Sequence, residues 1–188
     1  MANQKRNKNT IPQKINTFGG SYLKSNPKAE RPLCVSRAIH VVLKSSWATG
    51  SYSMLQKYNS RKIEDIVRST AESCRIKVYH LVNVGNHLHL VIKLKDIADY
   101  RKFIRIITGL IARHVLKRQR GPVLTPKKKL KKIKFWLARP FTRIINWGRD
   151  YKYVDRYMEK NKNDAKSAFA AWGFDVVDFN LIQMLSTG

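Results

Sequence analysis

The clearest alternation of apolar and polar residues lies in residues 78–94, VYHLVNVGNHLHLVIKL, where two runs of strand length flank the dipeptide Gly85-Asn86. A Gly-Asn pair between β-rich runs predicts a hairpin with a two-residue turn, because both residues tolerate the backbone conformation of such a turn. On one face, the predicted register pairs Val84 with His87, Val82 with His89 and His80 with Val91. On the other face, it places Tyr79, Leu81 and Asn83 against Leu88, Leu90 and Ile92.

The segment before the hairpin predicts a strand and a helix. Residues 38–47, AIHVVLKSSW, are rich in β-branched and apolar residues and predict a first core strand. The helix is predicted to follow Ser60 as its N-cap, with Glu64 and Asp65 in its first turn. Its apolar positions keep i, i+3, i+4 spacing and are Ile63, Ile66, Val67 and Thr70.

A second amphipathic helix is predicted to begin at Asp96 and to end before Gly121-Pro122. This helix carries an apolar stripe that includes His114, and a histidine in such a position is more often a packed residue than a ligand. The stripe consists of Phe103, Ile104, Ile107, Leu110, Ile111, His114 and Val115.

The last part of the chain predicts a strand and a third helix. Residues 135–145, FWLARPFTRII, end in a strand-like segment, and a helix begins at Asn146 or Asp150 and runs to Ala165. One face of this helix carries Trp147, Tyr151, Val154 and Met158. The adjacent face carries Tyr153, Tyr157 and Asn161.

Charge changes this picture most, because the formal net charge of the chain is +26 at pH 7. Such an excess indicates a polyanionic partner, of which nucleic acid is the first candidate. Residues 1–32 form a basic segment, and no acidic residue lies between Tyr100 and Arg149. We predict phosphate contacts with nucleic acid by the basic residues of the second region: Lys127, Lys128, Lys129, Lys131, Lys132, Lys134, Arg139 and Arg143.

His87 and His89 are candidate metal ligands, because residues i and i+2 of a strand face the same side. Two such imidazoles lie close enough to share a divalent cation. The alternative is a pair of solvated polar residues on the wet face of an amphipathic strand. His80 falls on the same face in the predicted register.

Several motifs together resemble one protein family. They are a strand with His40-Val41, a hairpin that ends in NHLHLVI, the following amphipathic helix, the basic stretch with FWLARPFTRII, and a helix with YMEKN. From about Arg37 to Asn161 the chain resembles the single-tyrosine HUH transposases, especially the REP-associated tyrosine transposases. Their hairpin usually reads like PNHVHLLI, so Gly85 stands where proline is usual.

The resemblance implies an α+β fold, a ferredoxin-like (RRM-like) antiparallel sheet with helices packed on one face, a basic N-terminal arm and a C-terminal helical extension. It also implies that His87 and His89 bind Mg²⁺ or Mn²⁺ and that Tyr157 is the nucleophile. Asn161 occupies the position where the family often has a glutamine as third metal ligand. His80 is the alternative third ligand, and Tyr153 the alternative nucleophile.

The function that the resemblance implies is cleavage and rejoining of single-stranded DNA at hairpin or palindromic elements. The expected intermediate is a 5′-phosphotyrosine. Two other functions remain open: a catalytically silent nucleic-acid-binding module on the same fold, and a basic RNA-binding protein of the ribosome. The family works as dimers or monomers, and the sequence leaves this choice open.

For domain organisation, we predict a basic arm over residues 1–32, a catalytic domain over 33–164 and a C-terminal extension over 165–188 that packs on the core. No apolar run approaches the roughly 20 residues that span a bilayer. The basic N-terminus lacks the apolar region of a signal peptide. We therefore expect a cytoplasmic, nucleoid-associated protein of a prokaryotic-type cell.

Overall fold

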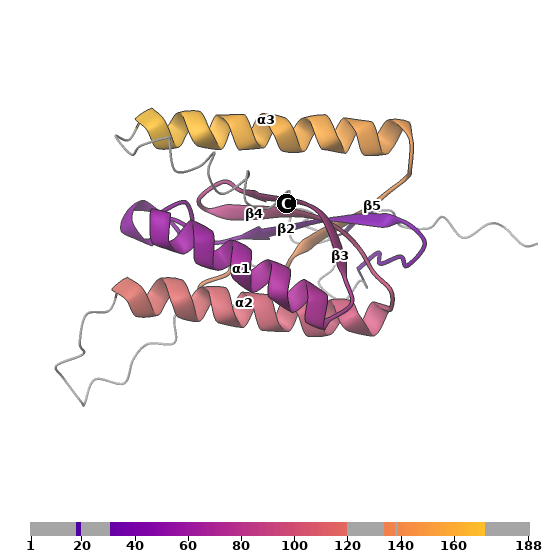
Figure 1. Cartoon of the computed structure of the whole chain (residues 1–188), viewed down its shortest axis with the longest axis horizontal. Coiled ribbons are helices and arrows are strands. Elements are labelled where there is room, and N and C mark those ends of the chain that lie inside the picture. The colour runs from indigo at the N-terminus through magenta and orange to yellow at the C-terminus, as the bar shows by residue number, and fades with distance from the viewer. Residues whose placement is uncertain (1–17, 20–30, 120–133, 138, 172–188) are drawn as a thin grey trace, which may run out of the picture.

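The computed structural model describes residues 18–19, 31–119, 134–137 and 139–171 (Figure 1). Within these ranges, the strands form one antiparallel sheet in the order β1-β5-β2-β4-β3. In chain order, the elements are β1 (Phe18–Gly19), β2 (Ala38–Lys44), a 3-10 helix η1 (Gly50–Tyr52), α1 (Lys57–Ser73), β3 (Lys77–Asn83), β4 (His87–Lys93), α2 (Ile97–Gln119), β5 (Phe141–Ile145) and α3 (Arg149–Ala171).

The four longer strands confirm the predicted ferredoxin-like fold. Helix α1 connects β2 to β3 and helix α2 connects β4 to β5, which gives the chain order β-α-β-β-α-β. Strands β2 and β4 lie in the middle of the sheet. Helices α1 and α2 cover one face of the sheet and α3 lies across the other (Figure 1).

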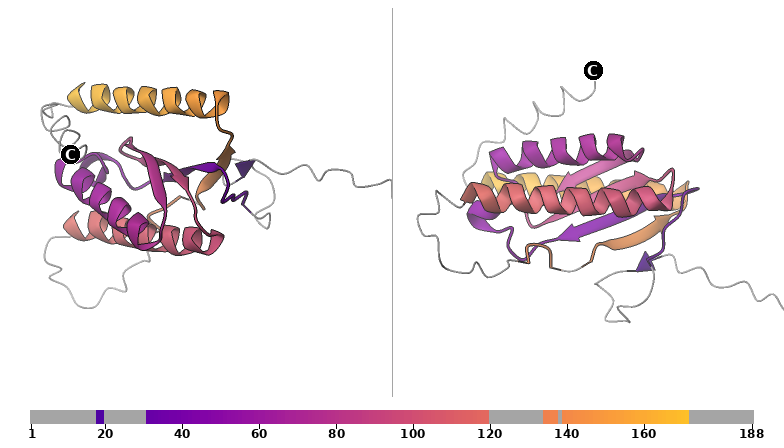
Figure 2. Two further views of the ribbon diagram at one scale, coloured as in Figure 1. Left: turned by 45° about the vertical axis from the view of Figure 1, so that its right-hand side comes forward. Right: turned by 90° about the horizontal axis from the view of Figure 1, so that it is seen from below.

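Helices α1 and α2 lie side by side over the same face of the sheet (Figure 2). This face holds the larger hydrophobic core. β4 contributes Leu88, Leu90 and Ile92, all fully buried, as the predicted apolar face requires. A smaller cluster lies under α3, and its buried members are Ala38, Val82, Val91, Ile145, Val154 and Met158. Both central strands are therefore buried on two sides.

The hairpin has the predicted register over most of its length. Val82 pairs with His89, and Val84 N donates to His87 O at 3.0 Å. Gly85 has a φ of +92°, which explains why glycine suits the turn. A β-bulge between Val78 and His80 makes Val78 the partner of Ile92, so the prediction for Tyr79 was wrong. The extra residue shifts the alternation, and Tyr79 packs with the cluster under α3.

Helix α1 begins one turn earlier than predicted, so Ser60 is not its N-cap. The side chain of Asn59 is buried and donates to Ser53 O at 2.9 Å, which fixes the chain before Ser60. Ser60 N already donates to Gln56 O at 2.8 Å, within the first hydrogen-bonded turn. The predicted stripe is confirmed, since Ile63, Ile66, Val67 and Thr70 are all buried.

The other two helices differ from prediction at particular residues. Asp96 precedes α2 and its carboxylate accepts from Ala98 N at 2.9 Å. Leu110 is 38% exposed, although the stripe predicted it as buried. Helix α3 begins at Arg149, between the two predicted starts, and continues beyond Ala165 to Ala171. The predicted stop at Gly121-Pro122 lies outside the described residues.

Candidate active site

A pocket of about 460 Å³ lies between the sheet and α3. Strands β2, β4 and β5 form one side of it and α3 forms the other. The lining residues are His40, Val42, His87, His89, Phe141, Arg143, Tyr153, Val154 and Tyr157. It therefore brings together histidines, an arginine and two tyrosines that are far apart in sequence.

His87 and His89 both face this pocket from β4. Their ring centroids are 4.7 Å apart, with an interplanar angle of 72°. His89 is only 3% exposed, whereas His87 is partly exposed. The alternation of the strand thus directs Leu88 and Leu90 to α1 and α2 and the two imidazoles to α3.

His40 lines the pocket and was not predicted as a member of the site. Its Nε2 lies 3.0 Å from Nδ1 of His89, and the two rings stack with centroids 5.3 Å apart. In the sequence, His40 is one polar residue in the apolar segment AIHVVLK, and it was noted only as part of the strand motif His40-Val41. Its position next to His89 follows from the pairing of Val42 with His89, which depends on the order of strands in the sheet.

Burial lowers the pKa of each imidazole of this pocket and so favours the neutral form. It lowers the pKa of His89 to about 3, with a further contribution from the neighbouring His40 and His87. It lowers the pKa of His40 to about 4, helped by the positive charge of Arg143. The pKa of His87 is also lowered, by burial and then by Lys44. Neutral imidazole is the form that binds metal ions.

Tyr157 lies closer to the histidines than the alternative Tyr153 does. The Tyr157 ring meets His89 edge-on at 5.6 Å between centroids and His40 at 6.2 Å. Tyr153 lines the same pocket but is 64% exposed, compared with 43% for Tyr157. Both phenols are therefore accessible, and Tyr157 is the one in ring contact with the imidazoles.

The structure does not bring either candidate third ligand to the histidine pair. Asn161 does not line the pocket, and its Nδ2 donates to Tyr157 O at 2.7 Å along α3. His80 Nε2 lies 3.1 Å from Tyr151 Oη and 3.1 Å from Asp155 Oδ1, away from the pocket. In the described part of the chain, no three side chains of His, Cys, Asp or Glu form a metal-binding group.

A divalent cation fits the two hairpin imidazoles. Nε2 of His89 is buried and has no hydrogen-bond partner, so it offers an unused lone pair if its ring proton is on Nδ1. With two protein ligands, a cation keeps positions for water or phosphate oxygens. The two imidazoles would thus hold such a cation with coordination positions left open, unlike a closed structural site.

The predicted DNA-binding residues are only partly described. Lys127, Lys128, Lys129, Lys131 and Lys132 lie outside the described residues. Lys134 and Arg139 are exposed. Arg143 lines the pocket, where its Nη2 lies 2.5 Å from Asp150 Oδ1. Arg143 therefore combines an ion pair at the start of α3 with a position beside the histidines.

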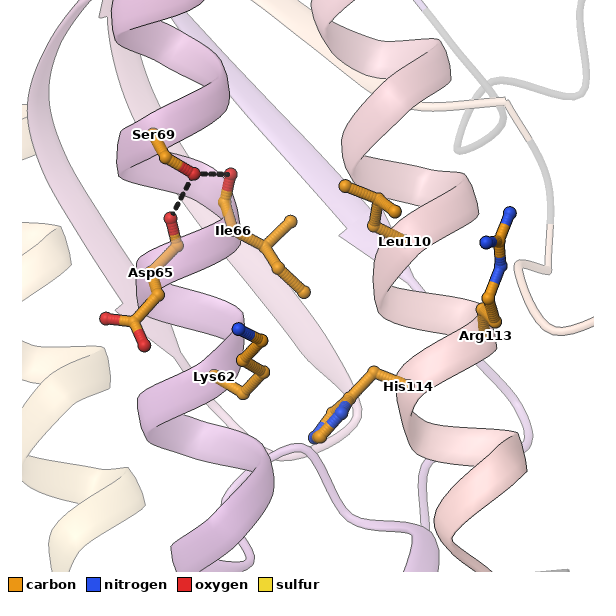
Figure 3. Close-up of a pocket in the computed structure, with 7 residues that line it drawn as sticks. All are labelled: Lys62, Asp65, Ile66, Ser69, Leu110, Arg113 and His114. Atoms are coloured by element: carbon orange, nitrogen blue, oxygen red, sulfur yellow. Dashed lines mark hydrogen bonds between the residues drawn. The ribbon is translucent and has the colours of Figure 1, made fainter.

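A second pocket, of about 700 Å³, lies on the opposite side of the sheet between α1 and α2 (Figure 3). Leu110 and Ile66 contribute apolar surface, and Lys62, Arg113 and His114 contribute basic groups. These side chains project from two helices, and Arg113 points away from Lys62 in Figure 3. The histidine pair, His40 and the tyrosines all lie at the other pocket, which we take as the candidate active site.

Comparison with one solved structure supports the fold. A structure of the REP-associated tyrosine transposase bound to a REP hairpin matches with a TM-score of 0.50 and 12% identity, over 73% of each chain. A protein from Deinococcus radiodurans R1, provisionally described as a transposase, matches with a TM-score of 0.44 and 15% identity, over 74% of this chain and 98% of that one. No curated protein matches. Among the described residues, no helix has the length and apolar character of a membrane span.

The family comparison covers most of the fold and the whole pocket. The model of the family "Transposase IS200 like" matches residues 37–161, which include β2 with His40, the hairpin histidines and Tyr157 on α3. These bounds agree with the extent of the resemblance that the motifs indicated. The chain belongs to the IS200-like transposase family.

Proposed function

We propose that this chain cleaves and rejoins single-stranded DNA with Tyr157 as nucleophile and with His87 and His89 as metal ligands. The observation that carries the proposal is the shared pocket, in which the Tyr157 ring lies 5.6 Å from that of His89. Tyr153 is the less favoured nucleophile because no ring contact joins it to the imidazoles among the described contacts.

In the proposed reaction, Tyr157 Oη attacks a phosphorus atom of the DNA backbone. An O–P bond to the tyrosine forms while the bond from phosphorus to the 3′ oxygen breaks. The phenol proton is released to a base or to solvent, and the 3′ oxygen takes up a proton. The 5′-phosphotyrosine keeps the energy of the phosphodiester, so a 3′-OH from another strand can reverse the step and join new ends.

The phenol needs assistance, because a tyrosine hydroxyl is a weak nucleophile unless a base, a positive charge or a metal ion activates it. Arg143 lines the pocket and supplies positive charge close to the site of attack. A Mg²⁺ or Mn²⁺ ion on His87 and His89 would act as a Lewis acid toward a non-bridging phosphate oxygen. Burial of His89 contributes by holding that imidazole in its neutral form.

We propose hairpin or palindromic single-stranded DNA as the substrate. The large positive charge supports a phosphate-rich partner. The structurally similar transposase bound to a REP hairpin makes hairpins the first DNA to test. The division into an arm (1–32), a catalytic domain (33–164) and an extension (165–188) stays a prediction, although Phe18–Gly19 of the arm pairs with β5.

The test is formation of a covalent protein–DNA adduct on hairpin-flanked single-stranded DNA with Mn²⁺, measured by denaturing electrophoresis. We expect an adduct with the wild-type chain and with Tyr153→Phe, which is the matched control on the same helix. Tyr157→Phe and His87→Ala should form none. An adduct that persists in Tyr157→Phe and disappears in Tyr153→Phe would transfer the role to Tyr153.

A catalytically silent DNA-binding module is the second candidate function. One observation favours it: the Asn161 amide is bonded to its own helix and contributes nothing to the pocket. DNA binding without an adduct for any hairpin sequence or metal ion would support this alternative.

A further inference from the structure

Each of the two hairpin imidazoles uses its Nδ1 atom in a hydrogen bond with another side chain. His87 Nδ1 lies 2.5 Å from Oδ1 of Asn86, and His89 Nδ1 lies 3.0 Å from Nε2 of His40. An amide oxygen can only accept a hydrogen bond, so neutral His87 carries its proton on Nδ1. The lone pair of His87 is then on Nε2.

The same tautomer is favoured for His89 by the cost of the alternative. His89 and His40 are 3% and 6% exposed, so water does not compensate for a missing partner. A proton on Nε2 of His89 would be a buried donor without an acceptor, because this atom has no partner. A proton on Nδ1 is donated to His40 instead, and the Nε2 lone pair stays available.

We propose that Asn86 and His40 are positioning residues that hold His87 and His89 in one tautomer, with the proton on Nδ1 and the Nε2 lone pair free for a divalent cation. The inference rests on the proposed function only for the presence of that cation. The protonation state that it assigns belongs to the metal-free chain. A metal-ligating histidine commonly has its other nitrogen fixed in this way.

The sheet explains why His40 is the residue that performs this task for His89. Val42 is the direct partner of His89 across the β2–β4 pair, and His40 is the diagonal neighbour on the same face. The two rings stack with an interplanar angle of 19°. Tyr157 contacts both rings edge-on, so their orientation also sets what the phenol meets.

The first test is the tautomer of each histidine in the metal-free protein, measured by ¹⁵N NMR of labelled histidine side chains. We expect Nδ1–H for His87 and His89 in the wild-type chain. His40→Leu removes the acceptor and should shift His89 toward a mixture of tautomers. His40→Gln places an amide oxygen near the former Nε2 and should keep Nδ1–H. Nε2–H at His89 in the wild-type chain would overturn the inference.

The second test is Mn²⁺ affinity, measured by titration calorimetry without DNA. His40→Leu and Asn86→Ala should each weaken binding by about 10- to 100-fold, the usual effect of losing a partner of a metal ligand. His40→Gln and Asn86→Asp keep an acceptor and should stay near the wild-type affinity. His80→Leu removes a histidine outside the pocket and serves as the matched control, with no change expected.

Two results of the titration would contradict the inference: wild-type affinity in His40→Leu, or equal weakening in folded His40→Leu and His40→Gln. No Mn²⁺ binding by the wild-type chain would also overturn it. If His40→Leu fails to fold, His40→Gln and the wild-type tautomers decide. Failure of the proposed function is separate, since it appears as absence of the Tyr157 adduct while tautomers and Mn²⁺ binding are as expected.

Discussion

Leu90 and His89 are adjacent residues of β4, yet their side chains lie on opposite faces of the sheet, in an apolar core and at a polar pocket. Leu90 is fully buried under α1 and α2, in a core made of apolar side chains from both helices and the sheet. His89 is equally hidden from solvent, but it lies beside His40, a pocket and a tyrosine of α3. The face under α1 and α2 stabilises the fold. The face under α3 also buries polar groups whose hydrogen bonds are incomplete.

The difference shows that burial alone does not reveal the role of a residue. A buried polar atom without a partner destabilises the folded state. Such an atom on the α3 face, Nε2 of His89, lies at a pocket with candidate metal ligands and a candidate nucleophile. The two faces should therefore respond differently to substitution, and four measurements test this.

The largest effect is expected from truncating the core. Leu90→Ala should lower the free energy of unfolding by about 3–5 kcal/mol, because it leaves a cavity in a fully buried site. His89→Ala also removes the hydrogen bond to His40 but should cost less than Leu90→Ala, since loss of the unpaired Nε2 offsets part of the lost packing. Urea denaturation measures the free energy of unfolding of both variants. Equal losses would contradict the difference between the two faces.

Acid should act through the α3 face of the metal-free protein. The folded-state pKa values of His89 and His40, about 3 and about 4, lie below the ordinary value of 6.5. As the pH falls below 6.5, the unfolded chain therefore binds more protons than the folded chain does. The contribution of these imidazoles to the free energy of unfolding is fully present above pH 6.5 and is lost as the pH falls toward 4. Between pH 7 and 5, the loss is up to about 2 kcal/mol for each imidazole.

The control for this pH dependence is His40→Leu, measured in the same urea titrations with a chelator present. It should reduce the dependence by about half, because one of the two buried imidazoles is gone. An unchanged pH dependence in this variant would assign the effect to other groups.

Two glycines allow a smaller comparison. A Cβ at Gly85 would lie 3.0 Å from Ser53 Oγ, on a residue with φ of +92°. Gly85→Ala should therefore destabilise by about 1–2 kcal/mol. Gly109 lies within α2 with nothing within 4 Å of its added Cβ, so Gly109→Ala should stabilise by up to about 1 kcal/mol. In thermal unfolding, Gly85→Ala should lower the Tm and Gly109→Ala should raise it.

The smallest effect is expected at Tyr100, on the α1 and α2 side. Its hydroxyl is buried without a partner, and burial raises the pKa of this phenol. Tyr100→Phe should leave the free energy of unfolding within about 1 kcal/mol of wild type, on the stabilising side. Mn²⁺ affinity and adduct formation should not change. A loss of either would show that the core side also contributes to the site.

The hairpin and the two crossover helices could be predicted because their patterns are local. Alternation along β4 and the turn at Gly85 determine which side each histidine faces. The bulge at Tyr79 could not be predicted, since plain alternation continues through VYHLVN in the sequence. The early start of α1 depends on a hydrogen bond from Asn59 to Ser53, a contact between a loop and a helix that has no periodic signature.

The candidate site was predictable only in part, for a similar reason. His87 and His89 follow from one strand, and Tyr157 from the resemblance to a family. His40 joins them through pairing between β2 and β4, which are separated by a helix and another strand. Asn161 does not line the pocket, and its amide donates to Tyr157 O, which helix spacing does not reveal.

The aromatic cluster that the bulge creates gives the molecule an optical reporter. The Tyr79 ring lies 5.6 Å from Trp147 and 6.2 Å from Tyr151, where α3 begins. Trp147 and Tyr151 are 5.1 Å apart. Indole fluorescence responds to such neighbours. With the other tryptophans replaced by phenylalanine, the emission of Trp147 would report on this cluster in real time. It would show whether the helix that carries Tyr157 stays packed on the sheet when DNA is added.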